Sequence, residues 1–555
     1  MMTNAQEDNQ APNTTSFILT GKPISPGLAQ GLTHLHHSLL GPIDVSEQGN
    51  GDGIEYELSR LDAATATISD DLLELATRVE KQIDARLAEV FATHQLMVND
   101  RVLRDELRQE IVDNLVSASS AVKTVFLRWE KRFLLMESQV ARDKGDDMHD
   151  ISIRLQNALA GITVHSLDKI PDNCVLVMSR LLPSDTVFLA GRPIAAVLLQ
   201  YGSLGSHAAL FSREIGLPAI AGIPNLITSV PDNAYALVDA DRGAVTIRPN
   251  VDDKAVFQEK IKTKAEIFEA AGVHAQRPAV TKDGVSISVL ANVGCREDAE
   301  KAMHNGADGV GLYRIEQVYL GRSVPPDKDE LINEMRETLA AAKGHAICVR
   351  LLDIGADKPL PFLGFMAETN PALGRRGIRL LLEYPELLST QLSAILELSR
   401  ELDIRVLIPM VTLPSDVLIV KEQLLKLGEK MRLSEVPSIG AMIETPAAAL
   451  SAQAIGKYVD FLSFGTNDLT QYTFAADRDN AAVEQYFDDG SDVIFRLLQL
   501  VHNDNREIPL SLCGELAGRP EFISRLLHCG IRVLSVAPPL IPVVKQAIRE
   551  AKWLA

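Results

Sequence analysis

The sequence lacks three features that would place it in other classes of protein. It has no run of about 18 apolar residues, which a membrane-spanning helix needs, and its polar first 16 residues hold no apolar signal segment. Lysine and arginine form no cluster, and the formal net charge of −19 disfavours binding to nucleic acid. The five cysteines show no CxxC spacing, which argues against a zinc site or a disulfide framework. We therefore expect a cytoplasmic protein with reduced thiols, neither exported nor membrane-spanning.

What is present fits a large globular protein. The chain has 555 residues, of which 46% are hydrophobic and 23% are charged. This composition provides apolar material for several cores, and usual domain sizes suggest roughly three or four domains. We expect residues 1–16 to form a disordered tail. The acidic surface suits a soluble protein, and attraction to a basic protein partner is the other interpretation.

The first half of the chain alternates between two kinds of pattern. Residues 17–36 are typical of edge strands and turns. Residues 53–145 contain almost no glycine or proline and repeat apolar residues at helical spacing, before short apolar runs return. We predict an α/β domain of residues 17–36 and 149–250, with a helical subdomain of residues 37–148 inserted into it. A helical linker would follow at residues 251–280.

Residues 281–555 predict a (β/α)8 barrel. Short apolar runs alternate with mostly helical stretches in this segment, and the runs lie at residues 286–293, 309–314, 346–354, 405–411, 438–444, 461–468, 509–515 and 533–538. Eight strands alternating with helices over about 270 residues fit that fold, and a doubly wound open sheet is the competing interpretation. The barrel is favoured because polar residues fall where barrel enzymes build their sites, at the C-terminal ends of the strands. These residues are Arg314, Asp353, Glu444, Asn467, Asp468, Cys513 and Glu515.

Two carboxylates at neighbouring strand ends predict a metal site. Glu444 ends one predicted strand and Asp468 ends the next. Two carboxylates make an oxygen-rich site that suits Mg²⁺, which takes water and substrate oxygens as its other ligands. A general acid/base pair is one alternative. Another is that Thr445 and Asp468 cap the helices that follow.

Four arginines are expected near the same end of the barrel. They are Arg314, Arg350, Arg376 and Arg478. Each of them alone could form a surface salt bridge. Together they would clamp a small polyanion, because a guanidinium group binds phosphate and carboxylate with two parallel hydrogen bonds. A small, phosphorylated and acidic ligand is therefore indicated.

Two further residues have open interpretations on the sequence alone. Cys513 follows a predicted strand and precedes a glycine, so it is either a small buried hydrophobic residue or, beside cations, a group that transfers a proton. His207 lies in a glycine-rich turn, "YGSLGSHAAL". A lone histidine in such a turn is more often a surface or core residue than a catalyst.

Six ordered segments of the barrel region resemble Enzyme I, the phosphoenolpyruvate-protein phosphotransferase of the bacterial sugar phosphotransferase system. They are "GADGVGLYRIE", "RLLDIGADKPLP", "NPALGRRGIR", "IGAMIETPAAA", "FLSFGTNDLTQYTFAADRDN" and "SLCGELAG". The earlier segments "SPGLAQG", "FATHQLMVNDRVLRDEL", "DISIRLQNALAG" and "LLPSDT" match in the same order. The resemblance implies a swivelling phosphohistidine α/β domain, an inserted helical subdomain that binds the carrier protein HPr, and a C-terminal TIM barrel that binds phosphoenolpyruvate. It also suggests a homodimer through the barrel.

The resemblance further implies roles for individual residues. His207 matches the phosphohistidine, which takes the phosphoryl group from phosphoenolpyruvate and passes it to a histidine of HPr in the first step of sugar uptake. Cys513 matches the proton donor that completes pyruvate. Glu444 and Asp468 match the Mg²⁺ ligands. The residues that would contact phosphoenolpyruvate are Arg314, Arg350, Lys358, Arg376, Asn467, Asp468 and Arg478.

The chain departs from the family pattern at two places. Ser203, Leu204 and Gly205 stand where the family has glycine, an often basic residue and threonine, so the threonine hydroxyl beside the histidine is missing. In the barrel, Ile315 and Gln317 replace a threonine and an aromatic residue. The four arginines, both carboxylates and the cysteine are retained.

Two alternative functions fit the same motifs. One is the nitrogen-branch form of Enzyme I without its sensory domain, since only 16 polar residues precede the first predicted strand. The other is a regulatory protein that binds phosphoenolpyruvate with weak transfer, which the altered turn at His207 motivates. Relatives of pyruvate phosphate dikinase would need an ATP-grasp domain that a chain of this length cannot hold.

Overall fold

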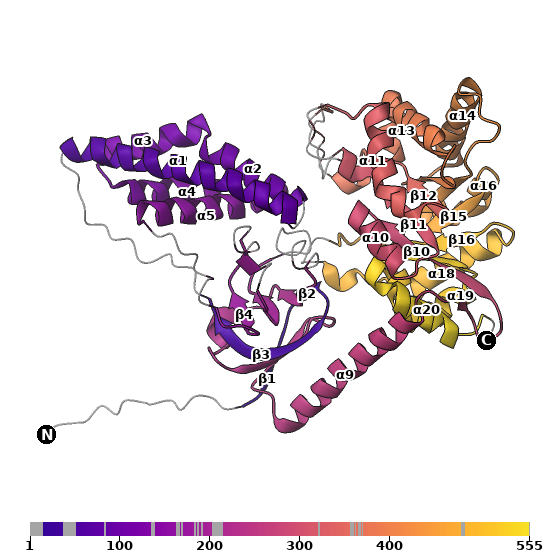
Figure 1. The fold of residues 1–555 in the computed structure, drawn as a ribbon, viewed down its shortest axis with the longest axis horizontal. Coiled ribbons are helices and arrows are strands. Elements are labelled where there is room, and N and C mark those ends of the chain that lie inside the picture. The colour runs from indigo at the N-terminus through magenta and orange to yellow at the C-terminus, as the bar shows by residue number, and fades with distance from the viewer. Residues whose placement is uncertain are drawn as a thin grey trace. The chain divides into compact units, whose positions relative to one another are not determined.

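The structure of the protein is a computed structural model in which the chain divides into two compact units, Met1–Lys262 and Thr263–Ala555 (Figure 1). Each unit has its own buried hydrophobic clusters. The structure describes residues 15–36, 51–82, 85–134, 139–161, 167, 170–182, 185, 188–189, 192–202, 212, 215–319, 322, 324–355, 360, 362–363, 368, 370–478 and 483–553.

The first unit is built on an eight-stranded sheet with the strand order β1-β8-β7-β3-β4-β5-β6-β2. The strands are β1 (Phe17–Thr20), β2 (Lys22–Ser25), β3 (Leu28–Leu35), β4 (Val175–Met178), β5 (Ala196–Leu199), β6 (Ala219–Ala221), β7 (Tyr235–Asp239) and β8 (Ala244–Ile247). The four strands from β3 to β6 run parallel as neighbours, so their C-terminal ends meet at one edge. The centre of the sheet is made of runs buried on both faces, such as "VLVM" and "AVLL".

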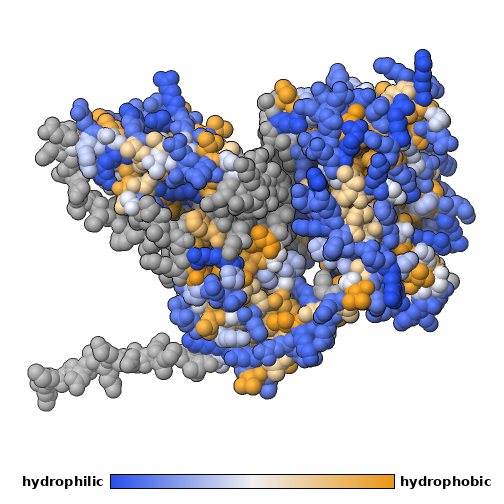
Figure 2. All heavy atoms as spheres, viewed as in Figure 1, coloured by the Kyte–Doolittle hydropathy of each residue, from blue (hydrophilic) through white to orange (hydrophobic). Residues whose placement is uncertain are grey.

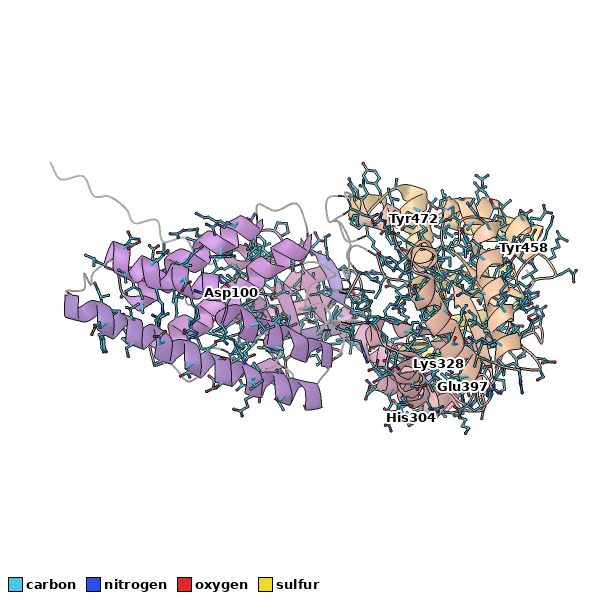
Figure 3. All side chains as sticks on the ribbon, turned by 90° about the horizontal axis from the view of Figure 1, so that it is seen from above. Asp100, His304, Lys328, Glu397, Tyr458 and Tyr472 are labelled. Atoms are coloured by element: carbon cyan, nitrogen blue, oxygen red, sulfur yellow. The ribbon has the colours of Figure 1, made fainter. Side chains whose placement is uncertain are left out.

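The described residues between β3 and β4, which are paired neighbours in the sheet, form five α-helices. They are α1 (Gly51–Gln82), α2 (Ala85–Val98), α3 (Arg101–Asn114), α4 (Ala118–Leu134) and α5 (Gln139–Leu159). Their apolar stripes share a core that includes Leu72, Ile111 and Val122. Asp100 is the N-cap of α3, and its side chain accepts a hydrogen bond from the Leu103 N–H. Asp100 is labelled in Figure 3.

A buried polar pair joins two of these helices. His94 of α2 is fully buried, and its Nε2 atom lies 3.1 Å from Asp147 Oδ1 of α5. The sequence analysis did not predict this pair. The short helix α8 (Leu226–Ser229) lies between β6 and β7, and the long helix α9 (Val251–Val273) follows β8.

The second unit contains a closed barrel of parallel strands. The strands are β10 (Ser286–Val293), β11 (Gly309–Arg314), β12 (Ala346–Arg350), β13 (Ile404–Ile408), β14 (Ile439–Ile443), β15 (Phe461–Phe464), β16 (Leu510–Leu512) and β17 (Val533–Val536). The barrel closes because β10 pairs with both β11 and β17. This confirms the predicted (β/α)8 barrel and excludes the open sheet. A two-residue strand, β9 (Ala279–Val280), adds antiparallel to β10 and was too short to predict.

Helices surround these strands (Figure 1). They are α10 (Arg296–His304), α11 (Lys328–Leu339), α12 (Ile378–Glu383), α13 (Pro385–Leu398), α14 (Pro414–Lys430), α15 (Pro446–Leu450), α16 (Ala452–Gly456), α17 (Thr466–Phe474), α18 (Asp492–Asp504), α19 (Ile523–His528) and α20 (Ile541–Glu550). Their apolar sides and the strands form the largest buried cluster. Hydrophilic residues predominate on the barrel face shown in Figure 2, as amphipathic outer helices require.

Among the described residues, no helix is both long enough and apolar enough to cross a membrane.

Candidate active site

Charged side chains gather at the C-terminal end of the barrel. Arg314 and Arg350 are the last residues of β11 and β12, and Glu444 directly follows β14. Asp468 lies in the first turn of α17, which follows β15, and Cys513 directly follows β16. Because parallel strands of a barrel all end at one face, these residues come from distant parts of the sequence to one place.

Arg376 is held by two carboxylates from different segments. Its Nη1 atom donates a 2.9 Å hydrogen bond to Asp468 Oδ1, and its Nη2 atom donates to Asp353 Oδ2 at 3.1 Å. Nη1 also lies 3.1 Å from the Tyr472 hydroxyl of α17 (Figure 3). Only 12% of the Arg376 side chain is exposed. The structure thus brings one predicted phosphate-binding arginine and one predicted metal ligand into direct contact.

Arg350 is held in the same way. Its Nη1 atom donates to Asp353 Oδ2 at 2.9 Å, and its Nη2 atom donates to Glu316 Oε1 at 2.9 Å. The sequence analysis gave Glu316 no role, although it is the second residue after Arg314 in the "RIE" motif. It also missed Tyr472, since nothing in the spacing of that residue distinguishes it from an ordinary helical tyrosine.

Two other arginines of the predicted set differ in their surroundings. Arg314 keeps accessible surface at the end of β11, but enclosure by the surrounding chain, together with the nearby Arg350, lowers the pKa of its guanidinium group. Arg478 lies 3.9 Å from Asp468 through its Nη1 atom. Asn467 accepts a 3.0 Å hydrogen bond from the Glu515 N–H, which ties the loop after β16 to α17.

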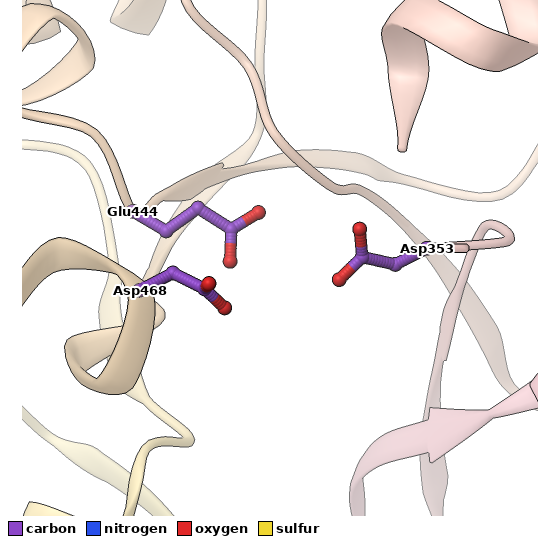
Figure 4. A group of neighbouring side chains, drawn as sticks. All are labelled: Asp353, Glu444 and Asp468. Atoms are coloured by element: carbon purple, nitrogen blue, oxygen red, sulfur yellow. The ribbon is translucent and has the colours of Figure 1, made fainter. Parts of the chain in front are cut away.

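Three carboxylates at this mouth point toward a common space, Glu444 and Asp468 from one side and Asp353 from the other (Figure 4). One oxygen of each lies within 4.8 Å of one oxygen of each of the others. Glu444 is almost fully buried, and its Oε1 atom accepts a hydrogen bond from the backbone N–H of Met410. An all-oxygen donor set of this kind fits a hard divalent cation. The predicted pair of carboxylates is therefore joined by a third.

The pKa values of the two buried carboxylates Glu444 and Asp353 are shifted in opposite directions. The pKa of Glu444 is raised to about 8, mainly by burial and also by the nearby Asp353 and Asp468, while Arg376 and Arg350 act in the opposite direction. Burial would also raise the pKa of Asp353, but Arg350 and Arg376 outweigh it and lower that pKa below its usual value. Asp353 is therefore ionised as the partner of two arginines, whereas no arginine of the described residues donates a hydrogen bond to Glu444.

Helix capping explains part of the local sequence. Thr445 caps α15, because its hydroxyl accepts a 3.1 Å hydrogen bond from the Ala448 N–H. Asp468 does not cap α17, whose N-cap is Gly465. The capping alternative thus applies to Thr445 and not to Asp468.

Cys513 is buried at the floor of this mouth. Its Sγ atom lies 3.6 Å from Ser463 Oγ and donates a 3.5 Å hydrogen bond to the Phe464 carbonyl oxygen. Burial raises the pKa of the Cys513 thiol, although Ser463 and Arg350 act in the opposite direction. The side chain therefore carries a proton at neutral pH, as a proton donor must. The position of Ser463 was not predicted.

Two predicted site residues, His207 and Lys358, lie outside the described residues. The altered turn at residues 203–205 also lies outside them.

Comparison with known proteins covers almost the whole chain. The sequence profile of the PEP-utilising enzyme, PEP-binding domain, matches residues 269–553. The mobile domain of the same enzymes matches residues 170–243, and their N-terminal domain matches residues 20–144.

Curated relatives agree with these profiles. The phosphoenolpyruvate-protein phosphotransferase of Geobacillus stearothermophilus is 33% identical over 90% of this chain and 88% of its own length. That of Haloferax volcanii is 34% identical over 89% of this chain and 87% of its own length. That of Bacillus subtilis is 31% identical over 91% of this chain and 90% of its own length. Identity of this level over nearly full length shows that the chain belongs to the phosphoenolpyruvate-protein phosphotransferase family, known as Enzyme I.

Proposed function

We propose that this chain takes the phosphoryl group of phosphoenolpyruvate onto His207, releases pyruvate, and passes the phosphoryl group to a histidine of an HPr-type carrier protein. The observation that carries this proposal is the cluster of arginines and carboxylates around a buried, protonated thiol at the barrel mouth. Such a cluster suits a substrate that has a phosphate, a carboxylate and a carbon that must accept a proton.

The arginines would bind the substrate and stabilise its charge. Arg314, Arg350, Arg376 and Arg478 are proposed to contact the phosphate and carboxylate groups, with Asn467 and Lys358 as further contacts. In phosphoryl transfer, most of the catalysis comes from positioning and from stabilising the charge that spreads over the phosphate oxygens. Fixed guanidinium groups in a partly buried mouth provide both.

Glu444 and Asp468 would hold the cation, and Mg²⁺ is the ion that the oxygen ligands favour. When bound there, Mg²⁺ would add positive charge beside the phosphate oxygens. Asp468 already contacts Arg376, so the cation site and the anion-binding arginines would share one edge.

The chemical step needs one nucleophile and one proton donor. A neutral His207 imidazole nitrogen would form a bond to phosphorus while the bond from phosphorus to the enol oxygen breaks. The enolate that leaves would take the proton of the Cys513 thiol at carbon, which gives pyruvate. The thiolate is then reprotonated from solvent before the next turnover.

The proposed domain roles follow from this chemistry. Residues 17–36 and 149–250 would carry His207, residues 37–148 would dock the carrier, and residues 251–280 would link them to the barrel of residues 281–555. Because His207 has to reach both the barrel mouth and the carrier, the linker would act as a hinge. The acidic net charge of −19 suits a carrier with a basic active face. We propose a cytoplasmic homodimer.

The test is phosphorylation by radiolabelled phosphoenolpyruvate with Mg²⁺. We expect acid-labile, base-stable phosphate on the wild type and its transfer to a purified HPr. His207→Ala should remain unlabelled, whereas His304→Ala, which changes an exposed histidine of α10, should label normally. An unlabelled wild type would refute the proposal, and a labelled His207→Ala would place the phosphoryl group on another residue.

A further inference from the structure

Asp353 lies between the two arginines that are most enclosed at the barrel mouth. Its Oδ2 atom accepts hydrogen bonds from Arg350 Nη1 at 2.9 Å and from Arg376 Nη2 at 3.1 Å. Its Oδ1 atom accepts from Arg376 Nη2 at 3.3 Å and from Arg376 Nε at 3.4 Å. Only 3% of the Asp353 side chain is exposed. Both carboxylate oxygens are therefore occupied by guanidinium groups.

Glu316 binds the second terminal nitrogen of Arg350, the one that Asp353 does not contact. Its Oε1 atom accepts from Arg350 Nη2 at 2.9 Å and from the backbone N–H of Asp353 at 2.9 Å. Glu316 Oε1 thus fixes Arg350 directly. It also fixes the backbone of Asp353, whose side chain binds the same arginine. Glu316 lies in a short 3-10 helix, η2 (Ile315–Val318), directly after β11, so a rigid element carries it.

The backbone beside Arg376 is shaped for this contact. Gly377 has a φ of +56°, and a Cβ atom on it would meet Asp353 Oδ1 at 3.1 Å and Met410 Cβ at 2.8 Å. A side chain at this position would be strained and would push against both neighbours. The close approach of Arg376 to Asp353 therefore depends on a glycine.

We propose that Asp353 and Glu316 are positioning residues for substrate binding: they hold Arg350 and Arg376 in the orientation that grips the phosphate of phosphoenolpyruvate, and Asp353 is not a metal ligand. This inference rests on the proposed function. Two guanidinium groups side by side repel each other and rotate freely on long side chains. A carboxylate between them removes the repulsion and fixes both rotamers before the substrate arrives.

The competing assignment makes Asp353 a third cation ligand, since it lies within 4.8 Å of Glu444 and Asp468. The two assignments predict different losses when Asp353 is neutralised. Loss of a positioning residue weakens the binding of a phosphorylated ligand and does not change the affinity for the cation. A metal ligand affects the affinity for the cation first.

The test uses two probes with the full-length chain. Phosphoglycolate, an unreactive phosphorylated carboxylate, is titrated by calorimetry at saturating Mg²⁺, and Mn²⁺ alone is titrated by electron paramagnetic resonance. We expect Asp353→Asn and Glu316→Gln each to weaken phosphoglycolate binding by about tenfold or more, because each removes a charge-assisted hydrogen bond. Both variants should bind Mn²⁺ within about twofold of the wild type, whereas Asp468→Asn should lose Mn²⁺.

A matched control and a double-mutant cycle separate positioning from general damage. Glu401→Gln removes the negative charge from a carboxylate that accepts a 2.9 Å hydrogen bond from Arg336 on the outer surface of the barrel, and it should leave both affinities unchanged. Because Asp353 acts partly through Arg376, the effect of Asp353→Asn should be smaller in an Arg376→Lys background, where only the contact with Arg350 remains intact. Full additivity in this cycle would contradict the proposal. So would weakened Mn²⁺ binding by Asp353→Asn, or unchanged phosphoglycolate binding by both Asp353→Asn and Glu316→Gln.

These outcomes are independent of the phosphorylation assay. If the wild type forms no phosphohistidine, the proposed function fails, and the titrations still decide whether Asp353 supports the arginines. If the wild type is active, the steady-state rates add a further readout. The two variants should then raise the KM for phosphoenolpyruvate by about tenfold with a smaller change in kcat.

Discussion

Arg376 Nη1 donates a 2.9 Å hydrogen bond to Asp468 Oδ1, so a residue predicted to bind phosphate and a residue predicted to bind a cation are direct partners. The same guanidinium group contacts Asp353 through its other nitrogens. A single arginine therefore bridges two carboxylates that belong to different strand ends. Its fork geometry is required for this, because a point charge can lie against one carboxylate but cannot span two.

We expect Arg376→Lys to lower kcat/KM for phosphoenolpyruvate by about 10²- to 10³-fold, the usual effect of removing one donor that stabilises transition-state charge. The positive charge is kept, so the loss would report the fork geometry. Initial rates of pyruvate formation over a range of substrate concentrations measure it. Arg375→Lys changes the neighbouring arginine, which is half-exposed and pairs with Glu383, and should have near-normal rates. Equal losses in the two variants would contradict this assignment.

Cation binding should depend on pH through Glu444. Burial raises the pKa of this carboxyl to about 8, so below that pH the side chain of the metal-free protein holds a proton. The proton has to leave before the carboxylate can bind a cation. The affinity for Mn²⁺ should therefore rise by about tenfold per pH unit up to about pH 8 and level off above it.

Electron paramagnetic resonance of free Mn²⁺ at several pH values between 6 and 9 measures this dependence. Glu444→Gln should bind Mn²⁺ weakly at every pH in this range. A wild-type affinity that stays constant from pH 6 to 8 would show that another group controls the site.

Cys513 and Cys348 provide a test of the proton donor with a built-in control. Both thiols are buried in one small cluster inside the barrel, together with Leu312, Leu407 and Met442. We expect Cys513→Ala to slow pyruvate formation by about 10²- to 10⁴-fold, the range typical of a lost general acid. Cys348→Ala removes a sulfur of the same size from the same core and should keep most of the activity. Phosphoglycolate binding should be normal in both variants, so a binding loss in Cys513→Ala would contradict a role limited to proton transfer.

The sequence predicted the barrel more fully than the interactions at its mouth. The strand β11 has the predicted bounds, because "GVGLYR" is a short apolar run that ends in a charged residue, Arg314. Strand ends also predicted which residues share a face, since that follows from the fold alone. Which arginine meets which carboxylate could not be predicted. The contact of Arg376 with Asp468 joins residues 92 positions apart, and only the packing of the loops decides it.

The helices of the first unit show the same limit. Helical spacing predicted buried faces, and His94 lies on one of them. Its partner Asp147 is 53 residues away on another helix. The apolar periodicity of a single helix does not predict how that helix aligns with a neighbouring one. From the sequence alone, His94 could be interpreted only as an ordinary surface or core residue. The role of His207 likewise stays a prediction.

Stability of the first unit should depend on pH through Asp185. This residue is 5% exposed, and its Oδ2 atom accepts a 2.9 Å hydrogen bond from the Leu182 N–H. The pKa of Asp185 is raised from 3.8 to about 7, mainly by burial and also by Asp150, against the Leu182 N–H, Arg154 and His149, which lower it. The folded state therefore binds the proton more tightly than the unfolded state. The resulting stabilisation is complete below about pH 3.8 and is lost as the pH rises through about 7.

Asp185→Asn cannot ionise and keeps an oxygen for the Leu182 N–H, so it should lack this loss. We expect the free energy of unfolding of the variant to exceed that of the wild type by roughly 2–4 kcal/mol more at pH 8 than at pH 4. Urea unfolding followed by Trp129 fluorescence in a Trp553→Phe background measures the first unit, because the chain has two tryptophans and these lie in different units. Asp172→Asn, an exposed aspartate of the same unit, should follow the wild type at both pH values. A difference between Asp185→Asn and the wild type that does not change with pH would mean that Asp185 is ionised in the folded protein.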